Sequence, residues 1–575
     1  MAAGLTRAIS RFAGSALRGA RLRRSRPAGP GPSAWVAVVL CLAAVCPAVL
    51  AGCGGGQAEP ESTPKPGGTL AYPLDGEPLS IEPLNAQDAS GLQVAHQVFQ
   101  GLTRWVMDDH GTLVTKPCIA ESWESSDAQT WTFHLRAGVT FQAPVSRPVT
   151  AQDFVDSWTR VTDPENASYV AYILAALEGC DDRGYQTDPA QGLTGVKALD
   201  DRTLQVRLRY PFADFPAVLG HPVAAVTPVD YVERVGAKKF AAKPVGTGPY
   251  AVVSWKHDRE LRLARNTAYW DASEPGWVDA IELPIFSDAE TMWDEFGKGL
   301  LDCSQVPAGQ ARAAGSDARV QSGEWSARSW PALAVAFVGI NMADTTLGQD
   351  PELRQAVAES TDAQAVIAGV GEDVPSPASG YVPPGVPGYK DGLDPYPKDV
   401  DAAAAVVAKL GDVPGLAYWY DEDVMQEKIA RTLASGWSRA GLTVEPAGYE
   451  WGAFLDKLAA GGRGGGSQLF RMGWIADYPA MDAFLYPLFQ SDQSRTGSYT
   501  FYVNPGVDDV LRQARATMDA QQRQNLYAQA EKLVLADMPA VPLYYYRYLR
   551  VSRARIGGFT VDPMGFTDMW RVWVR

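Results

Sequence analysis

The chain has 575 residues, 20% of them charged, and its 66 Asp and Glu against 51 Lys and Arg give a formal net charge of −15 at pH 7. This excess of acid argues against nucleic acid as a partner, because neutralising phosphates needs clustered Lys and Arg. The length is sufficient for two or three domains.

The amino terminus has the layout of an export signal. Residues 1–52 contain seven arginines and no acid, and the arginines precede an apolar run over 34–50 that is short for a membrane span. Residues 50–53 read Leu-Ala-Gly-Cys, which is typical of a bacterial lipobox, where cleavage before the cysteine leaves a thiol that takes a diacylglycerol. We predict a lipoprotein signal peptide over 1–52 and lipidation of Cys53. The alternative is an ordinary cleaved signal with an incidental cysteine.

Loss of this segment removes seven of the 51 basic residues, which leaves 44 against 66 acids and a net charge of −22. Residues 53–66 are rich in Gly, Pro, Glu and Ser, so they predict a flexible tether between the lipid and a folded domain.

The first half of the folded part predicts mixed strands and helices. Residues 67–71 are strand-like, 80–89 are extended and interrupted by prolines, and 94–106 are apolar enough for a buried helix. A capping box over 150–153 predicts a helix whose apolar residues recur every three or four positions. Alternation of apolar and polar residues predicts further strands at 131–135, 204–208 and 261–263.

The second half is richer in predicted helices. Asp350 and Pro351 are typical of a helix start, and we expect that helix to run to about Val370. Residues 376–394, rich in Pro and Gly, predict a long surface connection, and 461–466 predict a flexible loop. Other helices are expected at 400–410, 423–440, 507–518 and 521–535. Composition never divides the chain into two halves, which favours α/β lobes built from discontinuous segments.

No pattern in the chain indicates catalysis or a cofactor. The five histidines lie far apart without a metal-ligand spacing, the glycine-rich stretches lack a phosphate-binding Lys, and no Gly-x-Ser-x-Gly elbow occurs. We therefore expect no enzyme activity, no metal and no cofactor. Beyond Cys53, three cysteines remain and allow at most one disulfide: Cys118, Cys180 and Cys303.

The stretch 471–479 is the strongest candidate for a binding site. Arg471 and Asp477 could serve the two charges of a zwitterion, with Trp474 as a flat apolar contact between them. The alternative is a strand end that carries a surface arginine and a turn aspartate.

Several short motifs are spread along the chain: Ala-Glu-Ser-Trp at 120–123, Gly-Thr-Gly-Pro-Tyr at 246–250, Leu-Arg-Gln-Ala-Val at 353–357, Gly-Trp-Ile-Ala-Asp-Tyr at 473–478 and Asp-Met-Pro-Ala-Val-Pro-Leu-Tyr at 537–544. Over roughly 67–575 these motifs and their order resemble those of extracytoplasmic solute-binding proteins of ATP-driven (ABC) importers, in the class that carries peptides (family 5). The resemblance is greatest to oligopeptide-binding proteins.

This resemblance implies a two-lobed α/β clamp of the periplasmic-binding-protein type (type II, cluster C) with an additional subdomain, which closes on its ligand by hinge motion. It implies the following division: lobe I in 67–100, 258–330 and 545–575, the additional subdomain in 101–257, and lobe II in 331–544.

The resemblance also implies a peptide site. Asp477 would hold the free α-amino group, which in a water-excluded cleft needs a carboxylate. The backbone of Gly473 and Ile475 would pair with the peptide as an added strand. The segment from Gln87 to Ala89 would supply the opposing edge.

Two further ligand contacts are implied for side chains. Arg471 would meet the carboxylate of the ligand, because a planar fork suits two oxygens. Tyr169 would face the ligand if one residue is missing beside it.

The chain departs from the family pattern in places. Relatives join a cysteine at the position of Ile475 to one in the strand at 333–335, but both positions are apolar here, so we expect no such disulfide. Pro479 and Ala480 replace more polar residues, which puts the shape of the side-chain pockets in doubt.

From these observations we predict a monomeric lipoprotein on the outer face of the cell membrane, which captures oligopeptides and delivers them to the permease and ATPase subunits of an ABC importer. Alternatives within the family are a dipeptide, nickel-chelate or oligosaccharide carrier, or a peptide-pheromone receptor. A remote alternative is a secreted carbohydrate hydrolase that uses an unrecognised carboxylate pair.

Overall fold

The structure is a computed structural model that describes residues 63–307, 309–370, 375–462 and 466–575. The predicted signal peptide, Cys53 and most of the predicted tether lie outside the described residues, as does the middle of the predicted loop at 461–466. Residues 64–575 group into one compact unit. Within the described part, no helix is both long and apolar enough to cross a membrane.

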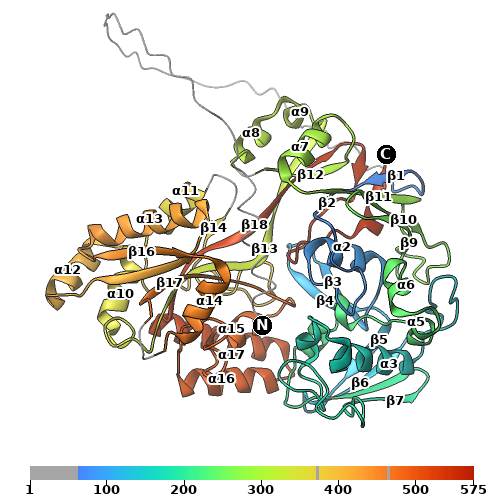
Figure 1. The fold of residues 1–575 in the computed structure, drawn as a ribbon, viewed down its shortest axis with the longest axis horizontal. Helices are drawn as coiled ribbons and strands as arrows, with labels where there is room; N and C mark the ends of the chain where they lie inside the picture. Colours follow the sequence, from blue (N-terminus) through green and yellow to red (C-terminus); the bar gives the residue numbers. More distant parts are fainter. Residues whose placement is uncertain (1–62, 308, 371–374, 463–465) are drawn as a thin grey trace, which may run out of the picture. The chain divides into compact units, whose positions relative to one another are not determined.

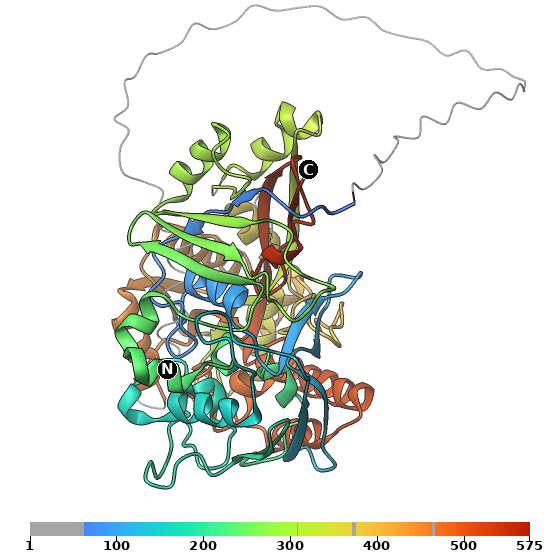
Figure 2. The same ribbon diagram turned by 90° about the vertical axis from the view of Figure 1, so that its right-hand side faces the viewer.

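A seven-stranded sheet runs through one half of the unit, in the order β12-β18-β13-β17-β15-β16, with β14 beside β18. Its two long strands, β13 (Trp325–Ile340) and β18 (Ala540–Arg553), pair antiparallel along most of their length. Figure 1 and the turned view of Figure 2 show these strands side by side. The other strands are β12 (Cys303–Gln305), β14 (Ser376–Pro377), β15 (Leu416–Asp421), β16 (Val444–Tyr449) and β17 (Leu469–Ile475).

Both faces of this sheet are buried. Phe337, Phe470 and Met472 point into one core, whereas their neighbours Val338 and Leu469 point into the other, as the alternation of side chains along a strand requires. The first core is shared with α14 (Trp451–Ala460), α15 (Asp482–Phe489), α16 (Pro505–Ala516) and α17 (Ala520–Asp537). The second is shared with α10 (Pro351–Ser360), α11 (Ala363–Val370), α12 (Val400–Leu410) and α13 (Val424–Arg439).

The other half of the unit contains two more sheets around a third core. One has the order β1-β11-β10-β9 with β2 beside β11, and the other has the order β5-β6-β8-β7. The strands of the first are β1 (Thr69–Ala71), β2 (Leu74–Asp75), β9 (Tyr250–Lys256), β10 (Glu260–Arg265) and β11 (Ala280–Phe286). Those of the second are β5 (Ala120–Glu124), β6 (Thr130–Leu135), β7 (Val196–Asp200) and β8 (Thr203–Arg207).

The remaining elements of the described residues are short. The small strands are β3 (Thr103–Met107), β4 (Leu113–Pro117), β19 (Ile556–Gly557) and β20 (Trp573–Val574). The helices not named above are α2 (Ala89–Val98), α3 (Ala151–Thr162), α4 (Phe215–Val218), α5 (Val229–Val235), α6 (Ala237–Ala242), α7 (Ala289–Gly297), α8 (Ala311–Ser316) and α9 (Ala318–Gln321). The 3₁₀ turns are η1 (Pro164–Asn166), η2 (Ala171–Leu174), η3 (Pro222–Ala224) and η4 (Met569–Arg571).

Most local predictions are confirmed. The strands expected at 131–135, 204–208 and 261–263 are β6, β8 and β10. The capping box is present, because Asp153 accepts the Thr150 N–H at 2.8 Å and so closes the first turn of α3. The helices expected at 400–410, 423–440, 507–518 and 521–535 correspond to α12, α13, α16 and α17.

The helix predicted at 94–106 is wrong in its boundaries. The helix α2 starts earlier, at Ala89, because Asp88 caps it by accepting the Gly91 N–H at 2.8 Å. It ends at Phe99, whose backbone is extended, and the chain then enters β3, which pairs with β4. Pairing with a second strand overrides the apolar run that suggested a continuing helix.

Two predictions in the second half are also corrected. The helix expected over 350–370 is two helices, because Asp362 accepts the Ala365 N–H at 3.0 Å and starts α11 after α10 has ended at Ser360. The connection at 376–394 does not stay on the surface. Tyr381 is fully buried, and Glu531 of α17 accepts its backbone N–H at 2.7 Å.

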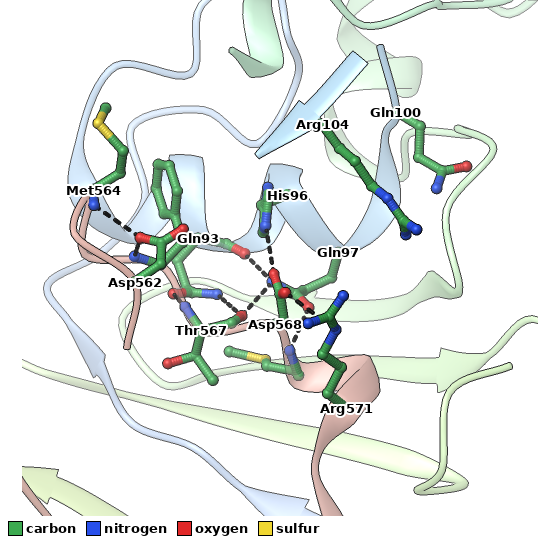
Figure 3. A network of polar contacts seen from close by, with 12 residues as sticks. Gln93, His96, Gln97, Gln100, Arg104, Asp562, Met564, Thr567, Asp568 and Arg571 are labelled. Carbon is green, nitrogen blue, oxygen red and sulfur yellow. Dashed lines mark hydrogen bonds and ion pairs between the residues drawn. The ribbon is translucent and has the colours of Figure 1, made fainter. Parts of the chain in front are cut away.

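The carboxyl-terminal segment fixes the position of α2 (Figure 3). The amide groups of Gln93 and Gln97 both donate to the carbonyl of Thr567, and Gln93 also accepts the Thr567 N–H at 2.9 Å. His96 lies 3.0 Å from Asp568. Because these side chains point from one face of the helix to one backbone segment, α2 is held without freedom to rotate.

Candidate ligand-binding site

The strand β17 has a partly free edge. On one side it pairs with β13 from Ile340↔Leu469 to Ala334↔Ile475, but on the other side β15 reaches only Leu469 and Phe470. No other described strand pairs with 471–475 on that second side. The backbone N–H and C=O groups there can take an added strand, as the prediction for Gly473 and Ile475 requires.

The side chains of this strand are closely surrounded. Trp474 is half-buried, and its indole N–H donates to the carbonyl of Ala483 at 2.7 Å, which fixes the ring. A Cβ added at Gly473 would lie 3.1 Å from the carbonyl oxygen of Val335. A larger residue would therefore press on the neighbouring strand, and glycine suits this position.

Asp477 lies two residues beyond the end of β17 and is partly buried. Among the described residues, one side chain donates a hydrogen bond to it: the hydroxyl of Tyr172 in η2, at 3.1 Å. Burial raises the pKa of this carboxyl group to about 6, and the bond from Tyr172 offsets only part of that effect. Among the described residues, no Lys, Arg or His forms an ion pair with Asp477, so the site has a negative charge without a partner.

Arg471 has a different environment. It is 4% exposed and lies 3.4 Å from the carboxylate of Asp421, at the end of β15. Burial acts to lower the pKa of Arg471, but Asp421 and the hydroxyls of Tyr546, Tyr544 and Tyr418 raise it. The guanidinium thus already has a charge partner in the chain, which the sequence reasoning missed. The predicted contact between Arg471 and a ligand carboxylate stays a prediction.

The surroundings of Arg471 contain several polar atoms that are short of partners. No described residue forms a hydrogen bond with four buried atoms: Arg471 Nη2, Asp421 Oδ1, Asp423 Oδ2 and Tyr418 Oη. Asp423 adds a second carboxylate near the same guanidinium. A net negative charge therefore surrounds the one arginine that was expected to attract a carboxylate.

The tyrosine that contacts Asp477 is Tyr172, and the predicted contact of Tyr169 with a ligand stays a prediction. The side chain of Tyr169 is 72% exposed, and its backbone N–H donates to Asn85 at 3.4 Å. Tyr172 lies in η2, whereas Tyr169 precedes this turn. The spacing Tyr-x-x-Tyr was the sequence signal that could have pointed to Tyr172.

The segment Gln87–Ala89 lies at the start of α2. Gln87 is half-buried, Ala89 is exposed, and Asp88 between them caps the helix. The neighbouring Leu84 carbonyl accepts a hydrogen bond from Ser168, in the segment that leads to Tyr172. Residues 84–89 thus lie close to the elements that contact Asp477, but their predicted contact with a ligand stays a prediction.

Cysteines and metal ligands play no visible part in this site. Cys118, Cys180 and Cys303 are buried and unpaired, and Ile475 lies opposite Ala334 in the ladder. Within the described ranges, no group of three His, Cys, Asp or Glu side chains is arranged to hold a metal.

The chain is similar to known proteins over most of its length. The family model "bacterial extracellular solute-binding proteins, family 5 Middle" matches residues 114–496. The oligopeptide-binding protein OppA of Bacillus subtilis is 29% identical over 558 residues, which cover 92% of this chain and 97% of that protein. The periplasmic oligopeptide-binding protein OppA of Salmonella typhimurium is 29% identical and covers 86% of this chain and 90% of its own length.

A solved structure shows the same fold. HbpA2 from Haemophilus parasuis superposes with a TM-score of 0.78 at 22% identity and covers 88% of this chain and all of its own. The mixed α/β architecture with its two halves is accordingly the two-lobed clamp of periplasmic binding proteins. Since the family model matches well over half of the sequence, the chain belongs to the bacterial extracellular solute-binding proteins of family 5.

Proposed function

We propose that this protein captures oligopeptides outside the cytoplasmic membrane and delivers them to the permease of an ABC importer. Relatives named as oligopeptide-binding proteins match it nearly end to end, which supports this assignment. The chain itself performs no chemistry, and partner ATPase subunits supply the energy. A lipid on Cys53 holds it at the membrane, and it acts as a monomer.

The unpartnered carboxylate of Asp477 carries this proposal. A buried charge without a partner is costly, and an incoming ammonium removes that cost by forming an ion pair. The raised pKa of Asp477, about 6, is the expected sign of a carboxylate that has no cation nearby. A free α-amino group at the start of a peptide is a cation of the right size.

The free edge of β17 supports a peptide in preference to a sugar. An extended peptide with its amino terminus at Asp477 can pair with Ile475 and then Gly473, and so runs antiparallel to β17. Main-chain pairing uses only N–H and C=O groups, so it accepts many sequences. The division into lobe I (67–100, 258–330, 545–575), an additional subdomain (101–257) and lobe II (331–544) is part of the same proposal.

Calorimetric titration of peptides tests the role of Asp477. The unlipidated protein is titrated with a tetra-alanine peptide and with its N-acetylated form, and the same pair is titrated into Asp477→Asn. We expect N-acetylation to weaken binding to the wild type by at least roughly 2 kcal/mol, as for a buried charge partner. In Asp477→Asn the two peptides should bind equally weakly, because the ammonium then has no carboxylate.

A matched control separates this effect from loss of folding. Asp509→Asn makes the same change in α16, where the side chain is 64% exposed and pairs with Arg512. It should bind both peptides as the wild type does. Equal affinity of the wild type for free and acetylated peptides would overturn the peptide assignment.

The lipid anchor has its own test. The intact protein, expressed in a bacterium with lipoprotein processing, should partition into detergent and yield an acylated amino-terminal cysteine by mass spectrometry. Cys53→Ala should stay in the aqueous phase. A wild-type protein that starts at another residue without lipid would contradict the anchor while leaving the peptide site untouched.

A further inference from the structure

A cavity of about 70 Å³ lies beside the first turn of α2, at the end of the segment predicted to face the ligand. Ala89 and Ser90 form one wall, and Gln305 of β12 and Arg550 of β18 lie opposite. The volume is enough for a carboxylate group together with bound water, since one water occupies about 30 Å³ in the liquid. Ala89 also belongs to the segment Gln87–Ala89, which the resemblance assigns to the edge that faces the peptide.

Arg550 supplies a positive charge that is not neutralised. It donates one hydrogen bond, from Nη1 to the carbonyl of Leu549 at 3.1 Å, and stacks loosely over Tyr548. No described Asp or Glu forms an ion pair with it. A guanidinium has five N–H donors, so most of the donor capacity of Arg550 is available to a ligand.

A second arginine reinforces this charge. Arg328 on β13 lies directly opposite Arg550 in the ladder, and it is exposed. Residues directly opposite on neighbouring strands project to the same face, where like charges repel each other. An anion between or beside the two side chains would relieve that repulsion.

Polar groups in the cavity wall fit the same ligand. Ser90 is 5% exposed, and its hydroxyl has no hydrogen-bond partner among the described residues. The helix end by itself is not the anion site, because Asp88 already accepts the N–H groups of Gly91 and Leu79. Within the described part of the chain, the hydroxyl of Ser90 has no hydrogen-bond partner and the guanidinium of Arg550 has no carboxylate in ion-pair contact.

One carboxylate also lines the cavity. Asp75 lies close enough to Arg550 to feel its charge, but the two side chains form no ion pair within 4.0 Å. Among the residues that line the cavity, Arg550 is the one cation and Asp75 is the one carboxylate. Arg328 adds its charge from the neighbouring strand.

The walls of the cavity are held in place before any ligand arrives. Gln93 lines it, and two hydrogen bonds fix its side chain (Figure 3): its amide donates to the Thr567 carbonyl and its amide oxygen accepts the Thr567 N–H. Ligand binding therefore needs little ordering of α2, which favours affinity.

We propose that this cavity receives a carboxylate of the bound peptide, with Arg550 as its cationic partner and Ser90 as an added donor. The inference rests on the proposed peptide function. It transfers the role expected of Arg471 to Arg550, because Asp421 already pairs with Arg471 and Asp423 adds a second negative charge beside it. The carboxylate belongs either to the carboxyl terminus or to an acidic side chain.

Calorimetric titration of three peptide series distinguishes these sources. The probes are tri-, tetra- and penta-alanine as free acids, the same peptides as carboxyl-terminal amides, and the amides with one alanine replaced by glutamate at each position in turn. If the terminal carboxylate enters the cavity, at least one free acid should bind the wild type about tenfold or more tightly than its amide. If a side-chain carboxylate enters, a glutamate amide should show that gain.

Variants of Arg550 test whether this cavity causes the preference for a peptide carboxylate. Arg550→Gln should erase the preference for the carboxylate, and Arg550→Lys should restore part of it, since a point charge replaces the fork. Arg547→Gln is the matched control. Arg547 lies on the same strand, but its Nε already donates a hydrogen bond to the Ser329 hydroxyl at 2.9 Å. It should keep the full preference. Thermal unfolding of each variant verifies that it folds.

The outcomes separate this inference from the peptide function itself. If free acids, amides and glutamate amides bind the wild type equally, or if Arg550→Gln keeps the preference, the inference is overturned while the role of Asp477 stands. If no peptide of any series binds, the peptide function itself has failed. A preference that disappears in Arg471→Gln but not in Arg550→Gln would return the role to Arg471.

Discussion

Two aspartates five residues apart, Asp477 and Asp482, lie in opposite electrostatic environments. Asp482, at the start of α15, is fully buried and accepts four hydrogen bonds. Two come from Arg515 at 2.7 and 2.8 Å, and the others come from Tyr478 and Tyr527 at 2.7 and 2.8 Å. Within the described ranges, Asp477 accepts one side-chain hydrogen bond, from the hydroxyl of Tyr172 at 3.1 Å.

The pKa values follow from this difference. Burial acts to raise the pKa of both carboxyl groups, but the charge of Arg515 and its hydrogen bonds outweigh burial at Asp482 and lower the pKa there. At Asp477 nothing outweighs burial, and the pKa is raised to about 6. A carboxylate whose acceptor positions are full belongs to the interior of the fold, whereas the carboxylate of Asp477 is the one for which a charged ligand is proposed above.

The largest effect on stability should come from removing the carboxylate of Asp482, whose oxygens accept four hydrogen bonds. Asp482→Ala leaves the buried Arg515 without its partner, and we expect a loss of about 3–5 kcal/mol in the free energy of unfolding. Urea denaturation measures this. A loss below about 1 kcal/mol, the range of an exposed ion pair, would contradict the view that Asp482 is structural.

The second prediction concerns Asp477, where a substitution should raise the stability of the ligand-free protein. The folded-state pKa of Asp477, about 6, lies above its ordinary value of 3.8, so the folded protein holds a proton that the unfolded chain releases. The stability gained from that proton is complete below pH 3.8 and is lost as the pH rises through 6. Asp477→Asn avoids the loss, and above pH 7 it should be more stable than the ligand-free wild type by about 1–2 kcal/mol.

Denaturation of Asp477→Asn and the wild type at pH 4 and pH 8 tests this prediction. The two curves should nearly coincide at pH 4 and separate at pH 8. A variant less stable than the wild type at pH 8 would show that Asp477 has a favourable partner in the ligand-free protein, which would remove the contrast with Asp482.

The smallest effect concerns the hydroxyl of Tyr172. Tyr172→Phe removes the hydrogen bond from Tyr172 to Asp477, so the pKa of Asp477 should rise further and peptide affinity should fall by about 1 kcal/mol or less. Titration of a peptide across pH 5–8 would show the midpoint of the affinity loss shifted upward. Tyr169→Phe is the comparison, and a larger effect there would assign the contact to Tyr169.

The sequence alone predicts the helices and strands that depend on neighbouring residues. The alternation over 131–135 predicted β6, and the capping box at 150–153 predicted α3, because both depend on residues within one element. The apolar run at 94–106 misled because its second half pairs with β4, and an apolar run alone cannot distinguish a helix from a strand. Asp362 was overlooked as a cap, so one helix was expected where two exist.

The same distinction between local and long-range contacts applies to the candidate site. The resemblance to solute-binding proteins pointed to β17 and Asp477, and the structure gives that strand a free edge. The partners of the charged residues lie far away in the chain: Asp421 is 50 residues from Arg471, and Tyr172 is 305 residues from Asp477. No periodicity or motif links residues at such separations.

The sequence by itself determined the family, the mixed α/β class and the residue types at the end of β17, since these depend on motif order and local pattern. Only the tertiary structure decided which charges are satisfied. Arg471 and Asp482 are neutralised by the fold, whereas Asp477 and Arg550 are not. The reason is physical: the energy of a buried charge depends on the atoms packed around it, and those atoms come from distant segments that meet only when the chain folds.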